Sequence, residues 1–204
     1  MKVLSAILLA IVILTNGQNT HAADCKFQVN STDKFTKVLT QRTKWNALMH
    51  GLSVSRRDHS PFISILSIDG DAELQLKIET FIQQKEEPSL VELEDIIYVL
   101  EGAPLQIMME DRSITTLTAK HEVRNDAYVP SSGDKPVDTE LYWIKATTVI
   151  KYALNADVMK ALTSQPATKI RVTMANDDNL DFEIHKKSFG DFKTAVECID
   201  RRGT

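Results

Sequence analysis

The sequence is poor in cysteine, glycine, proline and basic residues, and each shortage excludes a class of protein. Two Cys among 204 residues are too few for a miniprotein held together by many disulfides. With 7 Gly and 6 Pro, the chain is neither a collagen-like repeat nor a low-complexity segment. The 24 Lys and Arg are outnumbered by 28 Asp and Glu, and the net charge of -4 argues against a strongly basic nucleic-acid-binding protein. The composition, 43% hydrophobic and 25% charged, fits one ordinary globular domain.

The only long hydrophobic run lies at the N-terminus. A positively charged start precedes the apolar segment Val3–Leu14, and a polar stretch that ends in small residues follows it. This arrangement is typical of a secretory signal peptide, and the run is too short for a membrane-spanning helix, which needs about 20 apolar residues. We predict a signal peptide over residues 1–22 and a single globular exported domain over residues 23–204. The mature protein is then periplasmic or secreted, without a membrane anchor.

The two cysteines lie near the two ends of the predicted mature chain. Exported proteins with an even number of Cys usually oxidise them to each other, so we predict a disulfide between Cys25 and Cys198. The alternative is a reactive or intermolecular thiol, but Glu197 and Asp200 beside Cys198 would raise its pKa and weaken it as a nucleophile. A lipidated Cys25 is disfavoured because the charged Asp24 precedes it. The sequence therefore favours a covalent link between the termini.

Alternating apolar and polar residues predict antiparallel hairpins as the main scaffold. Three pairs of such segments are separated by short stretches with turn chemistry. The pairs are 62–68 with 72–82, 104–109 with 114–119, and 169–175 with 180–185. A further strand is predicted over 141–153, after a turn-rich stretch over 125–140 that we interpret as a long loop.

Apolar residues at helical spacing predict an amphipathic C-terminal helix from Ser188 onward, with Ser188 and Asp191 as a capping box. A second, short helix is expected after Asn155, its N-cap, and before Pro166. The fold class predicted is α+β: mostly antiparallel sheet built from hairpins, a C-terminal amphipathic helix and one or two further short helices.

Two segments fit either a helix or a strand. Residues 89–102 have a capping box and helically spaced apolar residues, which favour a helix, but they also contain the β-forming run Ile96–Val99. Residues 35–52 have helically spaced apolar residues diluted by threonines, so we expect either a helix or a strand followed by a helix.

No pattern in the sequence predicts a catalytic residue, a cofactor or a metal site. His121 begins a zinc-binding helix motif, but Asn125 stands where the second His is required. The acidic alternation over 177–181 resembles a calcium loop, but Phe182 replaces its glycine, and Asp and Asn are common in hairpin turns. A glycine-rich phosphate loop and a nucleophile-elbow pattern are also missing from the sequence.

Three functions are consistent with these features. The first is a non-enzymatic exported protein that binds a macromolecule, such as another protein of its compartment, through a sheet face or the 125–140 loop. The second is a small-molecule or lipid carrier whose ligand contacts Tyr142, Trp143 and Tyr152. The third is a hydrolase whose site is assembled from distant residues, such as His121 or His185 with acidic neighbours. The sequence leaves the oligomeric state and the ligand open.

Overall fold

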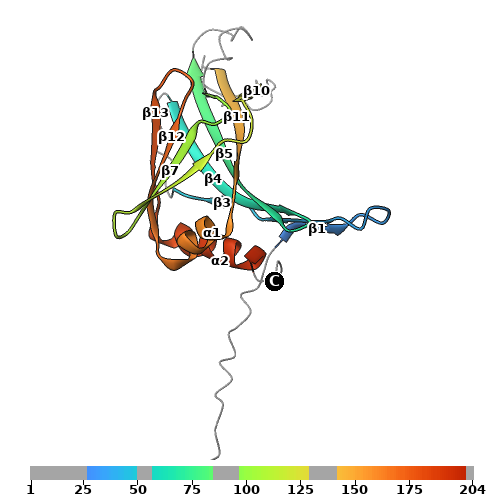
Figure 1. Ribbon diagram of the computed structural model, residues 1–204. Coiled ribbons are helices and arrows are strands. Elements are labelled where there is room, and N and C mark those ends of the chain that lie inside the picture. The colour runs from blue at the N-terminus through green and yellow to red at the C-terminus, as the bar shows by residue number, and fades with distance from the viewer. Residues whose placement is uncertain (1–26, 50–56, 85–96, 129–141, 201–204) are drawn as a thin grey trace, which may run out of the picture.

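Two main antiparallel sheets, a small two-stranded sheet and two helices make up the described part of the fold (Figure 1). The computed structural model describes residues 27–49, 57–84, 97–128 and 142–200. The predicted signal peptide and Cys25 therefore lie outside the described residues. The predicted α+β class, with mostly antiparallel strands and a C-terminal helix, is confirmed.

The larger sheet contains seven strands. Its long central strands are β4 and β5, which form one of the predicted hairpins, and β11, which is the predicted strand after the loop. The strand order is β1 (Phe27–Thr32), β2 (Leu39–Thr43), β4 (Arg57–Ile68), β5 (Asp71–Gln84), β11 (Tyr142–Ala153) and β10 (Asp126–Tyr128), and β3 (Asn46–Ala47) also pairs with β4. β1 therefore forms one end of this sheet.

The other two predicted hairpins form a second sheet rather than extending the first. Its strand order is β13 (Asn179–Glu183), β12 (Ala167–Thr173), β7 (Pro104–Met109) and β8 (Ile114–Thr118). A small third sheet pairs β6 (Tyr98–Val99) with β9 (Val123–Arg124). All three predicted hairpins are thus confirmed.

Backbone hydrogen bonds connect the two main sheets on both sides. On one side, Ala119 forms a β-bridge with Tyr152, immediately after β8. On the other side, the His185 N–H donates to the Leu48 carbonyl oxygen at 2.9 Å, immediately after β13. The inner faces of the two sheets are thereby held against each other, and they enclose the core.

Helices α1 (Ala156–Ser164) and α2 (Lys186–Asp200) lie at one end of the two sheets (Figure 1). Asn155 is the N-cap of α1, as predicted, and its side-chain oxygen accepts from the Val158 N–H at 2.8 Å. α2 begins earlier than predicted. The ring of His185 accepts from the Lys187 N–H at 3.3 Å, so His185 takes the capping role expected of Ser188.

The core consists of aliphatic side chains from both sheets and aromatic side chains from α2. Leu74, Leu76 and Ile78 alternate along β5 and are fully buried, as the period of two predicts. The second sheet and the helices supply further buried side chains. These include Leu105, Ile107, Ile170, Val172, Phe182, Leu162, Phe189, Phe192 and Val196.

The two ambiguous segments are strands where the structure describes them. Tyr98–Val99 is strand β6, so the helix favoured over 89–102 does not extend to its predicted end, because the β-forming side chains pair with β9. Within 35–49 the regular elements are β2 and β3, with no helix. A threonine of β2 helps to fix this segment as a strand, since the Thr43 side chain is buried and accepts a hydrogen bond from the Ile65 N–H at 2.9 Å. Residues 85–96 and 50–56 lie outside the described residues.

The outer face of the large sheet has a compact charged cluster. Lys77 contacts the rings of Trp45 and Phe62, with its Nζ 5.2 Å and 4.3 Å from their centroids, and donates to Glu79 at 2.8 Å. Burial raises the pKa of Glu79, but hydrogen bonds and charge from Lys77 and Lys145 outweigh it and lower the pKa below its ordinary value. The cluster thus explains the position of Trp45, which packs against Lys77.

Candidate functional site

The aromatic residues predicted to line a ligand pocket are all on β11, but they are spread along it. Tyr142 and Trp143 pair with Gln84 and Gln83 at one end of the strand, and their side chains lie outside the described part of the structure. Tyr152 is ten residues farther on, roughly 30 Å away at the rise of an extended strand. The three residues are not brought together.

Tyr152 lies in the core at the end of β11 near the helices. Its side chain is fully buried, and its hydroxyl group has no hydrogen-bond partner. Burial raises the pKa of Tyr152 above its ordinary value because the charged phenolate would be desolvated. Thr148, on the same strand, is also buried with an unpartnered hydroxyl group. Such groups cost stability because folding removes them from water without compensation.

Replacing Tyr152 with Phe is therefore expected to stabilise the protein by about 1 kcal/mol, since it removes an uncompensated hydroxyl group and keeps the ring. The unfolded tyrosine ionises near pH 10 and the buried one at higher pH. Ionisation of the unfolded state therefore leaves the stability unchanged below about pH 10 and lowers it as the pH rises further. Tyr152→Phe should then lose less stability above pH 10 than the parent, as measured by urea unfolding.

The same argument can be tested by comparing Thr148→Val with the matched control Thr43→Val. The Thr43 hydroxyl is buried like that of Thr148, but it accepts from the Ile65 N–H at 2.9 Å. Thr43→Val should therefore destabilise by about 1–2 kcal/mol, whereas Thr148→Val should not. Destabilisation by Tyr152→Phe would show that its hydroxyl group is hydrogen-bonded after all.

A groove with an estimated volume of 230 Å³ lies between α2 and the base of the β1–β2 hairpin, and we call it the α2 groove. Cys198, 4% exposed, lies in its wall. The other lining residues include Phe27, Thr43, Lys44, Asp191 and Ala195. Phe27 is the first described residue and is two residues after Cys25 in the sequence.

The described histidines have separate environments. His59 on β4 lies with its Nδ1 2.7 Å from the hydroxyl oxygen of Thr80, whereas His185 caps α2 and His121 is exposed. His50 lies outside the described residues. In the part of the chain that the structure describes, no group of three or more His, Cys, Asp or Glu side chains is arranged to hold a metal ion.

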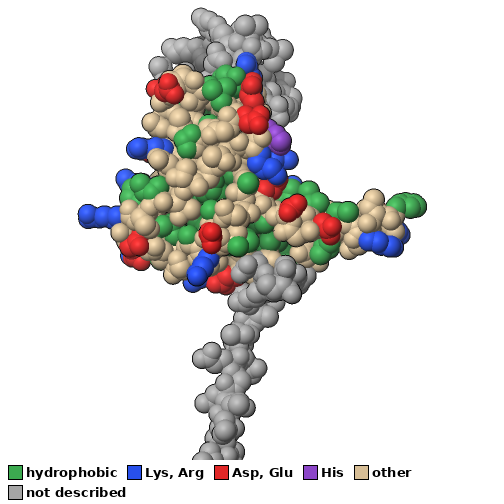
Figure 2. Space-filling model, in the orientation of Figure 1, with side chains coloured by type: hydrophobic (Ala, Val, Ile, Leu, Met, Phe, Trp, Pro, Cys, Tyr) green, Lys and Arg blue, Asp and Glu red, His purple; other side chains and the backbone are tan. Residues whose placement is uncertain are grey.

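The β1–β2 hairpin projects from the body of the protein (Figure 1). Its contact with β4 ends where Thr40 pairs with Ile68 and the Asp69 N–H donates to the Leu39 carbonyl at 2.8 Å. The turn beyond this point, residues 33–38, is the hairpin tip. At this tip Phe35 is 95% exposed. Figure 2 shows hydrophobic and basic side chains together at the end of the projection.

Hydrogen bonds hold the hairpin tip in one conformation. A carboxylate oxygen of Asp33 accepts from the N–H groups of Phe35 and Thr36 at 2.8 Å and 2.7 Å, and from the Thr36 hydroxyl at 2.9 Å. These bonds, the one from the Thr36 N–H foremost, lower the pKa of Asp33 below its ordinary value. Lys37 has a φ of 63° in the left-handed region, which a non-glycine residue adopts at some cost. Phe35 is thus presented by an ordered turn.

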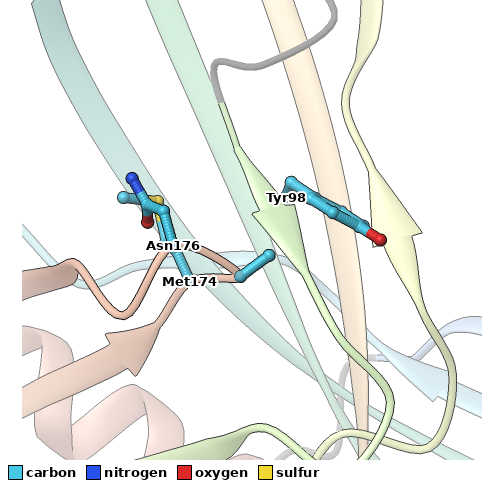
Figure 3. A pocket seen from close by; sticks show the side chains of 4 residues that line it. Tyr98, Met174 and Asn176 are labelled. Atoms are coloured by element: carbon cyan, nitrogen blue, oxygen red, sulfur yellow. The ribbon is translucent and has the colours of Figure 1, made fainter.

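A second pocket lies between β6 and the turn that follows β12, with an estimated volume of 340 Å³ (Figure 3). Tyr98, Met174, Ala175 and Asn176 line it. The ring of Tyr98 also contacts Arg124, whose guanidinium carbon is 4.2 Å from the ring centroid. This volume is at the lower end of the range for small-molecule sites.

No family model matches the chain, and neither a curated protein nor a solved structure shows significant similarity to it. Neither α1 nor α2, the helices of the described part, could cross a membrane.

The hairpin tip was missed by the sequence reasoning. The helical spacing of Phe35, Val38 and Leu39 concealed the turn between them. A signal for the turn is present, because Asp33 followed by Thr36 is the pattern of a side chain that accepts hydrogen bonds from the backbone two and three residues ahead.

Proposed function

We propose that this is a non-enzymatic exported protein, periplasmic or secreted, that acts by binding another protein through the hairpin tip. The observation that carries the proposal is Phe35, an aromatic side chain 95% exposed on an ordered, projecting turn. Aromatic side chains dominate the energetics of protein interfaces, and a preformed turn reduces the entropy lost on binding. The tip therefore has the properties of an interface anchor.

A protein partner is favoured over a lipid surface because a protein interface adds neighbouring contacts to the aromatic anchor, whereas the negative charge of the chain opposes an anionic bilayer. Burying one Phe side chain contributes about 2 kcal/mol, and Lys34 and Lys37 beside an anionic bilayer contribute about 1 kcal/mol each. Their sum of about 4 kcal/mol corresponds to a millimolar dissociation constant, and the net charge of the chain, -4, opposes it. An aromatic anchor seated in a protein pocket is worth about 2–4 kcal/mol by itself, and neighbouring contacts add to this.

Export is proposed from the N-terminal segment and is supported by the position of Cys198. Cys198 and Phe27 line the same groove, and Cys25 is two residues from Phe27. Two residues of extended chain span about 7 Å, and the Cα atoms of a disulfide are about 4.4–6.8 Å apart. A Cys25–Cys198 disulfide at this groove is therefore sterically accessible, and it would require the oxidising compartment to which a signal peptide leads.

Phe35→Ala should abolish most of the binding. The test is chemical cross-linking of the mature protein in its native compartment, followed by mass spectrometry of the adducts and titration of each purified partner. We expect Phe35→Ala to weaken the main interaction about 30-fold or more, which corresponds to the loss of an anchor of about 2 kcal/mol.

Ile114→Ala is the matched control, because Ile114 is also an exposed apolar side chain, 59% exposed, at the start of β8 in the other sheet. It should leave binding unchanged. Asp33→Ala keeps the ring but removes the bonds that order the tip, so it should give an intermediate loss. Adducts that persist at full strength in Phe35→Ala would refute the role of the tip.

The second candidate, a small-molecule or lipid carrier, is favoured by the pocket at Tyr98. Here the pocket residues differ from those predicted on β11. A ligand that co-purifies with the mature protein should then be lost on Met174→Trp, which fills part of the pocket, and native mass spectrometry would detect it. Retention of the ligand by this variant would exclude the pocket as its site.

A further inference from the structure

We propose that the hairpin tip binds a second copy of this chain, with the two β1 strands paired antiparallel and each Phe35 seated in the α2 groove of the other copy. The inference rests on the proposed function, since the same tip makes the contact. It adds the identity of the partner and the site that receives the ring.

Strand β1 is suited to pairing with another strand. It is the terminal strand of the large sheet and has β2 as its neighbour there. The Asp33 N–H bonds the Val38 carbonyl across the hairpin at 2.9 Å. Because hydrogen bonding alternates along an antiparallel pair, the backbone groups of Asn30 and Thr32 point away from β2. Groups so placed at a sheet edge are available to an added strand.

A two-fold axis near Ser31 places the tip of each copy beside the groove of the other. In that register Asn30 of one copy pairs with Thr32 of the second copy, so the outward-pointing backbone groups meet. Phe35 and Phe27 lie on opposite sides of Ser31, so the tip of each copy comes to the Phe27 end of the other copy's β1, where that strand is bulged. Phe27 lines the α2 groove. The contact is self-complementary, as a two-fold interface requires.

The α2 groove fits a phenyl ring in size, and its charge is complementary to that of the hairpin tip. Its volume of 230 Å³ exceeds the cavity of about 150 Å³ that binds benzene in an engineered protein. Phe27, Ala195 and Cys198 supply apolar walls, and the exposed Asp191 stands in the same lining. Neither Asp191 nor Lys34 of the tip forms an ion pair within the described residues. Lys34 of one copy and Asp191 of the second copy would therefore have complementary charges at this contact.

Opposite charges at position 31 test the pairing directly. Ser31 is exposed, and near the axis its side chain faces the same side chain of the other copy. By sedimentation velocity of the mature oxidised protein, we expect a dimer at about 100 µM. Ser31→Asp and Ser31→Lys should each raise the dimer dissociation constant at least about tenfold, because like charges then meet. An equimolar mixture of the two variants should restore the dimer.

Thr116→Asp is the control, since Thr116 is an exposed strand residue on β8, in the other sheet from the β1–β2 hairpin. It should leave the dimer unchanged. A parent protein that stays monomeric at about 100 µM overturns the inference, as does a mixture of the position 31 variants that fails to restore dimers.

A photoreactive benzoylphenylalanine in place of Phe35 identifies what the tip contacts. In a mixture of ¹⁴N- and ¹⁵N-labelled protein, we expect intermolecular cross-links from position 35 to the peptide that contains Asp191 and Cys198. Cross-links only to a different protein in the native compartment would overturn the self-pairing and leave the proposed function standing. No adduct from position 35 to any protein would overturn both.

Discussion

Loss of the predicted Cys25–Cys198 disulfide is expected to lower the stability of the mature protein by up to about 5 kcal/mol. The bridge would close a loop that contains nearly the whole mature chain, and the entropy of the unfolded chain falls most for such long loops. For a domain of this length, that loss corresponds to a decrease in Tm of roughly 10–20 °C. Calorimetry of Cys25→Ser and of the parent with and without reductant measures it.

A double-mutant cycle separates the bridge from the packing of Cys198. Cys198 is buried, so Cys198→Ala also changes contacts in the α2 groove. If the bridge exists, the double variant should be hardly less stable than the single variants, because either substitution alone already breaks the bond. Reductant should then have no effect on the double variant. Additive losses, together with a parent protein that is insensitive to reductant, would show that the two thiols are not joined.

The hairpins could be predicted because their turns are encoded locally. Asp69 and Gly70 have positive φ values of 51° and 94°, and Asp177 has a φ of 63°. Asp, Asn and Gly adopt this conformation more readily than other residues, so these turns can be recognised from the sequence. Arg112, with a φ of 70°, adopts the same conformation in the β7–β8 turn without such a signal. The β7–β8 hairpin was predicted instead from the alternation of apolar and polar residues in its two strands.

The assembly of the hairpins into two sheets could not be predicted in the same way. It depends on the Ala119–Tyr152 bridge and on the bond between His185 and Leu48, which join residues far apart in the sequence. Neither has a pattern of its own, because backbone groups of any residue can make such bonds. The start of α2 was misplaced for a related reason: Ser188 is buried, and its hydroxyl group has no partner, while His185 caps the helix.

The candidate site was only partly accessible to sequence reasoning. Cys198, singled out as a disulfide partner, lies on α2 and lines a groove with Phe27. Phe35 was assigned to an apolar stripe because of its helical spacing to Val38 and Leu39, and only the geometry of the turn shows its exposure. An exposed aromatic residue is a tertiary property that composition and periodicity do not encode.

Phe192→Ala is expected to destabilise the protein by about 3–5 kcal/mol through the cavity it leaves in the core. Phe192 is 1% exposed, and its ring meets that of Phe189 edge to face, with centroids 6.2 Å apart. α2 lies against β4 and α1, so a cavity at Phe192 weakens the attachment of the whole helix to the core. Urea unfolding should show the transition midpoint reduced by roughly 2 M, and the Tm should fall in parallel.

Two further variants distinguish loss of packing from other effects. Phe192→Met retains most of the side-chain volume and should cost less than about 1.5 kcal/mol. Lys193→Ala alters the neighbouring residue, which forms a partly exposed ion pair with Glu197 at 3.9 Å, so it should change stability by less than about 0.5 kcal/mol. A loss below about 1 kcal/mol in Phe192→Ala would mean that α2 contributes little to the core. Combined with Cys25→Ser, Phe192→Ala should bring the total loss near the 5–15 kcal/mol that stabilises a typical domain, and the double variant should be largely unfolded at 37 °C.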